Sequence, residues 1–215
     1  MNILVTAGPT REPIDPVRFL SNRSSGKMGF ALAEAANQAG HEVILISGPV
    51  HLEAAEGIHR INVESARDMY EAVSKQIDSA DAAVFCAAVA DYGSGEIAPE
   101  KIKKTGETLT ITLTRNADIL GSARDAFHFD GVLVGFAAET QNVLAHAREK
   151  LEKKQCDIMV ANDVSKSGIG FNHDENEVTL IFADGHERGL PRNSKLDIAR
   201  EIVREIERLA RLRIA

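Results

Sequence analysis

The chain has 215 residues, and 44% of them are hydrophobic, which is enough apolar material for a sizeable core in one domain. Acidic side chains outnumber basic ones by 32 to 25, so the net charge of −7 disfavours general binding to nucleic acid or to an anionic membrane surface. Two cysteines, Cys86 and Cys156, are too few for a disulfide framework or a zinc site. The sequence shows no signal peptide and no apolar run long enough to span a bilayer, so we expect a cytoplasmic soluble protein.

The first predicted strand, residues 2–6, is followed by a long connection before the first predicted helix at residues 27–38. The connection is rich in Gly, Pro, Ser, Asn and basic side chains, whereas strand-to-helix connections usually take about 2–6 residues. A loop of this length in a compact domain is typical of a functional segment. Within it, Asp15 followed by Pro16 predicts a short helix over residues 16–20, with Asp15 as the N-cap.

Most of the remaining elements alternate between strand and helix. The segment at residues 82–88 is continuously apolar, as expected for a central strand buried on both faces. The further strands are predicted at residues 41–47, 58–63, 132–138 and 157–161, and the further helices at residues 65–77, 117–126 and 143–153. This alternation predicts an α/β fold with a doubly wound, mainly parallel, Rossmann-like sheet.

Two segments depart from the alternation. Apolar and threonine residues alternate strictly over residues 108–114, which predicts a half-exposed strand, so we interpret the region around residues 92–114 as an inserted β arm. Residues 177–190 predict a C-terminal β-hairpin with its turn at Asp184 and Gly185, and Asn193 or Ser194 is expected to cap a final helix. Because no linker and no repeat interrupts the chain, we expect a single domain over residues 1–215.

Small residues follow several predicted strands, and ligands in such folds bind at the carboxyl ends of the strands. A nicotinamide-dependent oxidoreductase is one interpretation, but no Gly-x-Gly-x-x-Gly follows the first strand, and Ser47 stands where an acidic ribose-binding residue would be. The run Ser25-Gly26-Lys27 resembles a P-loop, but Met28 replaces the Ser or Thr that would hold magnesium. The P-loop is therefore rejected, whereas the oxidoreductase and a non-enzymatic nucleotide sensor are kept as alternatives.

Six segments together resemble phosphopantothenoylcysteine synthetase, the ligase of coenzyme A biosynthesis, and they occur in order over nearly the whole chain. The segments are TAGPTREPIDPVR at 6–18, SNRSSGKMG at 21–29, AAVADY at 87–92, KIKK at 101–104, GFAAET at 135–140 and ANDV at 161–164. The chain starts at the synthetase strand and so resembles the stand-alone form, without the flavin-dependent decarboxylase that precedes this domain in many bacteria. No flavin is therefore expected.

The resemblance implies a reaction in two steps. The carboxylate of 4′-phosphopantothenate attacks the α-phosphate of CTP, which releases pyrophosphate and forms an acyl-cytidylate; the amine of L-cysteine then displaces CMP. The residues alone fit CTP or ATP, and the similarity to bacterial members of the family implies CTP, with Mg²⁺ to offset the charge of two polyanions. The resemblance also implies a homodimer, for which the arm at residues 92–114 is the candidate interface because an exposed strand edge can pair with a partner.

The resemblance also implies the site residues. Asn22 would contact the acyl-cytidylate and Lys101 would stabilise phosphate charge, so these two are the catalytic candidates. The implied nucleotide-binding residues are Gly8, Cys86, Ala87, Asp91, Lys101, Asn116, Ala117, Asp118, Ile119, Phe136, Lys150 and Lys154. The implied acyl-binding residues are Asn22, Ser24, Ser25, Gly26, Ala87 and Ala88. Without the resemblance, Asn22 is an ordinary turn residue and the lysines form solvated surface clusters.

Overall fold

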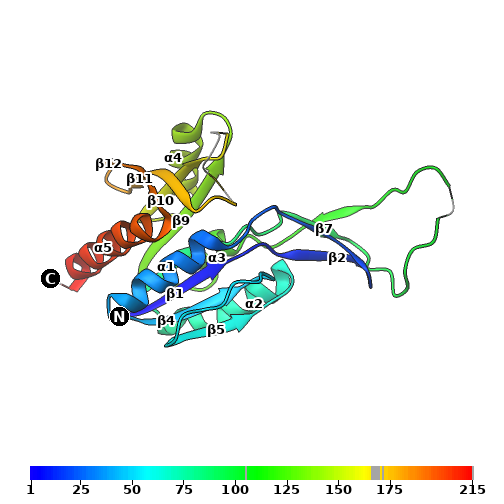
Figure 1. Ribbon diagram of the computed structural model, residues 1–215, viewed down its shortest axis with the longest axis horizontal. Helices are drawn as coiled ribbons and strands as arrows, with labels where there is room; N and C mark the ends of the chain where they lie inside the picture. The colour runs from blue at the N-terminus through cyan, green and yellow to red at the C-terminus, as the bar shows by residue number, and fades with distance from the viewer. Residues whose placement is uncertain (105, 166–169, 171, 215) are drawn as a thin grey trace.

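An eight-stranded sheet lies at the centre of the computed structural model, which describes residues 1–104, 106–165, 170 and 172–214 (Figure 1). The strand order is β12-β11-β10-β9-β6-β1-β4-β5. The parallel strands are β1 (Asn2–Ala7), β4 (Glu42–Ser47), β5 (Ile58–Asn62), β6 (Ala82–Phe85), β9 (Val132–Glu139) and β10 (Ile158–Asp163). The antiparallel hairpin of β11 (Glu175–Phe182) and β12 (Glu187–Ser194) extends the sheet at one edge. The predicted doubly wound, mainly parallel sheet and its C-terminal hairpin are confirmed.

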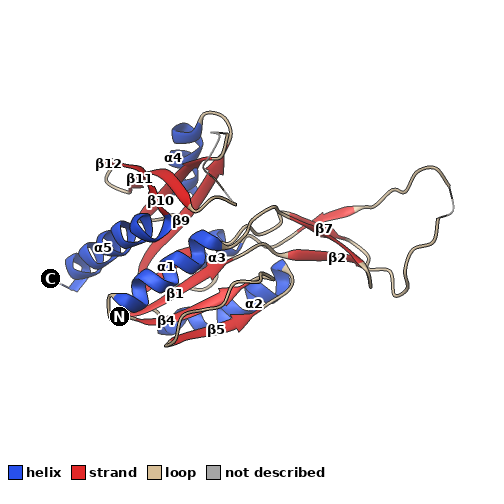
Figure 2. Ribbon diagram, in the orientation of Figure 1, coloured by secondary structure: helices blue, strands red, loops and turns tan. Residues whose placement is uncertain are grey.

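Helices cover both faces of this sheet (Figure 2). One layer holds α1 (Lys27–Gln38) and α5 (Lys195–Ile214), and the other holds α2 (Ala66–Gln76), α3 (Ile119–Asp125) and α4 (Val143–Lys153), with a short 3-10 turn at Ile77–Ser79. Successive strand side chains point to opposite faces, so Ile3 and Val5 pack in the first core while Leu4 packs in the second. Central strands therefore read as continuous apolar runs because both of their faces are buried.

An extended arm projects beyond the carboxyl end of the sheet (Figure 1). It contains two small antiparallel pairs: β2 (Arg11–Asp15) with β3 (Arg18–Ser21), and β7 (Tyr92–Ser94) with β8 (Leu113–Arg115). The backbone N–H of Ala98 donates to the carbonyl of Ile14 at 3.0 Å, which joins the two pairs. The sequence assigned only residues 92–114 to an arm, and the structure adds residues 11–21 to it.

The short helix predicted over residues 16–20 is wrong. Oδ1 of Asp15 accepts hydrogen bonds from the backbone N–H groups of Val17 and Arg18, both at 2.9 Å, and the chain reverses there into β3. An Asp before a Pro can cap a helix or close a turn with the same side-chain oxygen, so the local signal does not separate the two outcomes. Residues 11–15 pair with residues 18–21 as antiparallel strands, and this pairing requires a turn between them.

Two further boundaries differ from the prediction. The strand predicted over residues 108–114 is confined to β8, because residues 108–112 are largely exposed and no strand pairs with them in the part of the chain that the structure describes. The helix predicted from residue 117 begins at Ile119, since its N-cap is Asp118, whose carboxylate accepts from the N–H of Gly121 at 2.8 Å. The final helix is capped as expected by Ser194, whose Oγ accepts from the N–H of Asp197 at 3.0 Å.

Candidate active site

The strand order reverses between β1 and β6, and the loops after these two strands meet at the carboxyl edge of the sheet. In open α/β sheets the crevice at such a reversal is the usual ligand site. The two loops are joined by backbone hydrogen bonds: the N–H of Ala88 donates to the carbonyl of Gly8 at 2.9 Å, and the N–H of Thr10 donates to the carbonyl of Ala88 at 3.3 Å. This joint holds the β6 loop rigidly against the β1 loop and forms the floor of the site.

Three glycines allow α1 to start directly above this floor. Gly8 and Gly26 have positive φ angles of 75° and 80°, and a Cβ on Gly26 would lie 3.3 Å from the Cα of Gly8. A Cβ on Gly29 would lie 2.5 Å from the Cβ of Ala7, so only glycine lets α1 pack this closely on β1. Their roles match those of the three glycines in a dinucleotide-binding turn, with residues 9–25 inserted after the first one. The sequence pattern missed this motif because the insertion separates its parts.

A cavity of about 450 Å³, here called the larger cavity, opens on this floor toward α3 and α4. Most of the predicted nucleotide-binding residues line it, and so do three of the predicted acyl-binding residues, one of which belongs to both sets. These lining residues are Asn22, Ala87, Ala88, Asp91, Asn116, Ala117, Asp118, Ile119, Phe136, Lys150 and Lys154. Nδ2 of Asn116 donates to the carbonyl of Ala90 at 2.8 Å, which holds the segment before α3 against the β6 loop. The tertiary structure thus gathers into one cavity residues that are widely separated in the sequence.

Both lysines of the larger cavity are paired with carboxylates. Nζ of Lys150 lies 2.6 Å from Oε1 of Glu139, and Nζ of Lys154 donates to Oδ2 of Asp118. Burial works against ionisation of Asp118, but the hydrogen bonds from Lys154 and from the N–H of Gly121 outweigh it, so the pKa of this carboxyl lies below its usual range. A polyphosphate bound here would compete with these two carboxylates for the ammonium groups.

Asn22 connects the arm to the floor of the site. Its Nδ2 donates to the carbonyl of Ala88 at 2.9 Å and to the carbonyl of Val89 at 3.3 Å. The neighbouring Ser21 fixes the same strand, since its Oγ donates to the carbonyl of Thr10 at 2.8 Å. Nδ2 of Asn22 therefore has two carbonyl acceptors, and the longer bond, to Val89, is the weaker one and the easier to exchange for a ligand.

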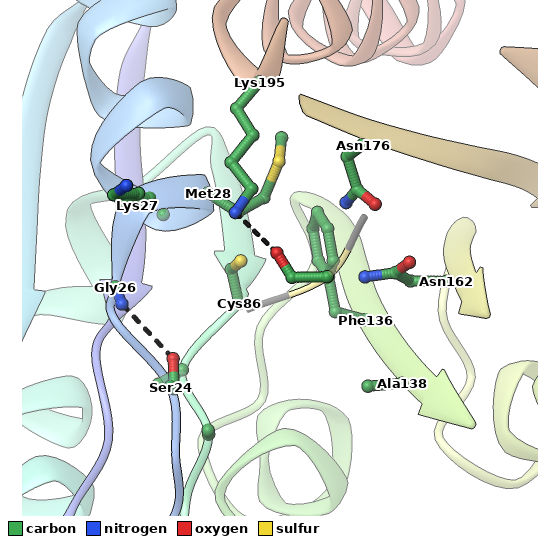
Figure 3. Close-up of a pocket in the computed structure, with 14 residues that line it drawn as sticks. Ser24, Gly26, Lys27, Met28, Cys86, Phe136, Ala138, Asn162, Asn176 and Lys195 are labelled. Carbon is green, nitrogen blue, oxygen red and sulfur yellow. Dashed lines mark hydrogen bonds between the residues drawn. The ribbon is translucent and has the colours of Figure 1, made fainter. Parts of the chain in front are cut away.

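A second cavity of about 110 Å³, here called the smaller cavity, lies on the α1 and α5 side of the floor (Figure 3). Its polar walls are formed by Ser24, Asn162, Asn176 and Lys195, which Figure 3 shows around the ring of Phe136. The two cavities share four lining residues: Ala87, Ala88, Phe136 and Ala138. A ligand in one cavity therefore has direct access to a ligand in the other across side chains that are mostly methyl groups.

Lys195 and Cys86 are the titratable groups with perturbed pKa values in the smaller cavity. Burial, followed by repulsion from Lys27, lowers the pKa of Lys195 to about 8. Its Nζ donates to the carbonyls of Gly170 at 2.8 Å and His173 at 2.6 Å, which ties the segment before β11 to α5. Burial raises the pKa of the Cys86 thiol to about 12, so this side chain is neutral and unreactive at physiological pH. Sequence reasoning overlooked Lys195, although a lysine in the first turn of a helix opposes the helix dipole and was a usable signal.

Three predicted site residues line neither cavity. Gly8 contributes its backbone to the floor, Ser25 lies in the turn before α1, and Lys101 lies on the arm. The residue after Lys101 is held at both backbone groups: the N–H of Ile102 donates to Oδ2 of Asp15 at 3.1 Å, and its carbonyl accepts from Arg18 at 2.9 Å. The hydrogen bond from Arg18 keeps the pKa of the buried Asp15 carboxyl well below its usual range. These contacts fix the segment that carries Lys101 to the hairpin that carries Asn22.

Within the described part of the chain, no group of three or more His, Cys, Asp or Glu side chains is placed to hold a metal ion. Asp91 and Asp118 both line the larger cavity, but Asp118 is already paired with Lys154. Mg²⁺ commonly binds through one or two carboxylates together with waters and substrate phosphates. The residues present therefore fit a Mg²⁺ ion that enters with a nucleotide, and not one held by a cage of protein ligands.

Comparisons with known proteins agree over almost the full chain. A family model described as the DNA/pantothenate metabolism flavoprotein C-terminal domain matches residues 1–209. The coenzyme A biosynthesis bifunctional proteins CoaBC of Vibrio vulnificus and Bacillus subtilis are each 50% identical, covering 97% and 98% of this chain but 52% of each relative. The chain thus spans about half the length of the curated relatives it matches.

A solved structure extends these comparisons to three dimensions. The crystal structure of the C-terminal domain of a coenzyme A biosynthesis bifunctional protein CoaBC has a TM-score of 0.83 and 42% sequence identity, covering 97% of this chain and 94% of that one. The agreement includes the mainly parallel sheet and its flanking helices. Among the described residues, no helix is both long and apolar enough to cross a membrane.

Proposed function

This chain belongs to the family of DNA/pantothenate metabolism flavoprotein C-terminal domains, and from this membership we propose that it is a phosphopantothenate–cysteine ligase. It joins 4′-phosphopantothenate to L-cysteine at the expense of CTP, through an acyl-cytidylate, and releases pyrophosphate and CMP. The observation that supports this most strongly is the larger cavity, because it combines Asn22 of the arm with Asp91, Phe136 and the lysine pair Lys150 and Lys154. Its volume of about 450 Å³ lies within the range of about 300–1,000 Å³ that is usual for ligand pockets.

We assign the larger cavity to the nucleotide. Phe136 offers a ring face against which a base can stack, and the segment from Asn116 to Ile119 supplies polar groups near it. Lys150 on α4 and Lys154 at the C-cap of the helix lie four residues apart. They reach the phosphates once these displace Glu139 and Asp118 as their partners. Mg²⁺, when bound with the nucleotide, supplies charge neutralisation on the phosphate oxygens.

The acyl group lies between the nucleotide and Asn22 in this proposal. In the first step, a carboxylate oxygen of 4′-phosphopantothenate forms a bond to the α-phosphorus of CTP, and the bond to pyrophosphate breaks. In the second step, the carbonyl of the acyl-cytidylate becomes tetrahedral and its oxygen gains negative charge. The amide of Asn22 is a neutral donor at the site's edge, and exchange of its bond to the Val89 carbonyl allows it to stabilise this oxygen.

The arm has two roles in the proposal. Lys101 approaches the phosphates when the arm, or the arm of a second copy, closes on the cavity. Of the eight large apolar side chains that are exposed among the described residues, six lie on the arm: Val17, Phe19, Tyr92, Ile97, Leu109 and Leu113. A second copy of this chain would cover them, and this favours a homodimer with the arms at its interface.

The decisive test of the reaction mixes the protein with 4′-phosphopantothenate, L-cysteine, Mg²⁺ and either CTP or ATP and measures pyrophosphate. Release that depends on phosphopantothenate is expected with CTP, and no release with either nucleotide would refute the proposal. Stabilisation against heat by CTP with Mg²⁺ but not by NADH separates the ligase from a nicotinamide-dependent enzyme, since a ligand stabilises the state that binds it. The dimer is tested separately by the mass in solution at micromolar concentration, where a monomer would contradict the arm interface.

A further inference from the structure

We propose that Thr10 is a positioning residue for the ligation, because its buried hydroxyl fixes the peptide group toward which the amide of Asn22 is aimed. The inference rests on the proposed function, in which Asn22 stabilises the oxygen of the acyl-cytidylate. Thr10 follows β1 and is not among the residues that line either cavity. It therefore acts through its neighbours and not by contact with a ligand.

The side chain of Thr10 is enclosed by protein. The residue is 0% exposed, and its Oγ1 accepts a hydrogen bond from the backbone N–H of Ala90 at 3.0 Å. Buried backbone N–H groups in native proteins almost always have a partner, and loss of that partner is costly. Because Thr10 is shut off from solvent, valine in its place would put a methyl group, and no water, beside the Ala90 N–H.

The hydrogen bond to Ala90 holds a peptide group that also contacts Asn22. The N–H of Ala90 and the carbonyl of Val89 belong to one peptide group, which is planar and trans, so its two polar bonds point in opposite directions. Thr10 holds the N–H end, and Nδ2 of Asn22 donates to the carbonyl end at 3.3 Å. A rotation of this plane would therefore move the Val89 oxygen relative to the Asn22 amide.

Thr10 also contacts the other acceptor of Asn22. The carbonyl of Ala88 accepts from Nδ2 of Asn22 at 2.9 Å and from the backbone N–H of Thr10 at 3.3 Å. The two carbonyls that orient the Asn22 amide are thus both held by Thr10, one by its backbone and the other through its hydroxyl. Only the second contact depends on the side chain, so substitution separates the two.

The proposed reaction uses the weaker of the two bonds. Asn22 exchanges its bond to the Val89 carbonyl for one to the acyl oxygen, so the Val89 oxygen must orient the amide without holding it firmly. A length of 3.3 Å meets both conditions, since N–H···O bonds are usually about 2.9–3.0 Å long. Thr10 keeps the carbonyl at this distance by holding the far side of its peptide group. A donor that is oriented before the reaction stabilises a developing oxyanion most effectively.

The surrounding segments do not depend on the Thr10 hydroxyl. The strand that carries Asn22 leads out of β3, which pairs with β2, and the Oγ of Ser21 bonds to the backbone carbonyl of Thr10. On the other side, Nδ2 of Asn116 donates to the carbonyl of Ala90 at 2.8 Å and holds the next peptide group. Loss of the hydroxyl should therefore release one peptide plane and leave the rest of the loop in place.

The test compares Thr10→Val, which keeps the shape of the side chain but not the hydroxyl, with Thr10→Ser, which keeps the hydroxyl but not the methyl group. Thr10→Val should lower kcat roughly tenfold or more, because small misplacements of a reacting group are costly, whereas Thr10→Ser should stay within about threefold of wild type. Both variants should have a lower melting temperature. Activity that follows the melting temperature and not the hydroxyl would overturn the positioning role.

Ser47→Ala is the control for the loss of a buried hydroxyl. Ser47 is 0% exposed at the end of β4, its Oγ donates to the carbonyl of Gly48 at 2.8 Å, and it lies outside the lining of both cavities. Ser47→Ala should lower the melting temperature and keep kcat within about twofold of wild type. Equal losses of kcat in Ser47→Ala and Thr10→Val would overturn the inference.

Combination with Asn22→Ala tests whether Thr10 acts through Asn22. Residues that act as a unit have effects that do not multiply. Thr10→Val should therefore change the kcat of the Asn22→Ala variant by less than about threefold. A further loss as large as that in the wild-type background would place the effect of Thr10 elsewhere and overturn the inference.

A last measurement needs no turnover. Amide hydrogen exchange followed by NMR should show the N–H of Ala90 exchanging at least roughly tenfold faster in Thr10→Val than in the wild type, with the N–H of Ala88, which donates to Gly8, unchanged. Equal exchange at Ala90 in the two proteins would overturn the role of the hydroxyl. Absence of pyrophosphate release from the wild type would instead refute the ligase function, so the two failures are distinguishable.

Discussion

Replacement of Asn22 by alanine is expected to remove most of the ligase activity and to leave the fold intact. The side chain is exposed, and its only described hydrogen bonds are those from Nδ2 to the carbonyls of Ala88 and Val89, at 2.9 and 3.3 Å. Both carbonyls lie at the rim of the larger cavity, so water can replace the lost donor. The two bonds are each worth about 0.5–1.5 kcal/mol, and at the rim the lower end of that range applies.

The expected effect on catalysis is larger than the effect on stability. A preorganised donor to a developing oxyanion typically contributes a factor of about 10²–10³ to kcat, which corresponds to about 2.7–4 kcal/mol. The loss of stability, about 1 kcal/mol, would lower the melting temperature of a chain of this size by only about 2–4 °C. An effect on activity that exceeds the effect on stability in this way is the signature of a residue that acts on the reaction.

The assay measures pyrophosphate and product amide under saturating substrates, together with a thermal unfolding curve. Ser21→Ala is the matched control, because Ser21 holds the same strand to the carbonyl of Thr10 but lies outside both cavities. Ser21→Ala should lose stability to a similar extent and keep most of its activity. A fully active Asn22→Ala variant, or equal losses of activity in the two variants, would refute the assignment of Asn22 to the reaction.

Three further changes test other parts of the structure. Gly29→Ala places a Cβ 2.5 Å from the side chain of Ala7 on β1. The cost of this overpacking should exceed the gain in helix propensity and lower the free energy of unfolding by about 1–2 kcal/mol. In thermal unfolding, the control Gly189→Ala should be nearly neutral, because its Cβ would have no atom within 4 Å. Lys154→Ala should raise the KM for CTP roughly tenfold, whereas Lys153→Ala, at the preceding residue and outside both cavities, should not. The pKa of Asp15 is depressed in the folded state, so the ionised carboxylate stabilises the fold above about pH 4, and this stabilisation is lost as the pH falls below that value. Asp15→Asn should therefore be less stable at pH 7, and its free energy of unfolding should fall less steeply at acid pH. An unchanged fall at acid pH, measured by urea titrations, would contradict this.

Periodicity predicted the central fold because the physical cause of the pattern is local. A strand buried on both faces must be apolar throughout, and an amphipathic helix must repeat every three to four residues, so the segments 82–88 and 143–153 were recognisable in isolation. The arm was harder, since Asp15 and Pro16 suit both a helix start and a tight turn. The alternation over residues 108–114 was a true pattern, but among the described residues only β8, at its end, is paired with another strand.

The site was predicted unevenly for the same reason. The resemblance proposed Asn22, Asp91, Lys150 and Lys154 as site residues, and the structure places all four in the lining of one cavity. It did not indicate that each lysine is paired with a carboxylate, because Glu139 and Asp118 belong to other elements. Nor did any sequence pattern show that Lys101 lines neither cavity, since its position depends on the contacts of Ile102 with the hairpin.

The long connection after the first strand shows where each kind of information ends. Its length and composition alone predicted a functional segment, because ordinary strand-to-helix connections are short. Only the tertiary structure showed that Gly8, Gly26 and Gly29 meet at one junction, that residues 11–21 fold into an arm, and that the turn before α1 opens a second, smaller cavity. Contacts between residues far apart in the chain depend on how strands pair and helices pack, and no local pattern of side chains records them.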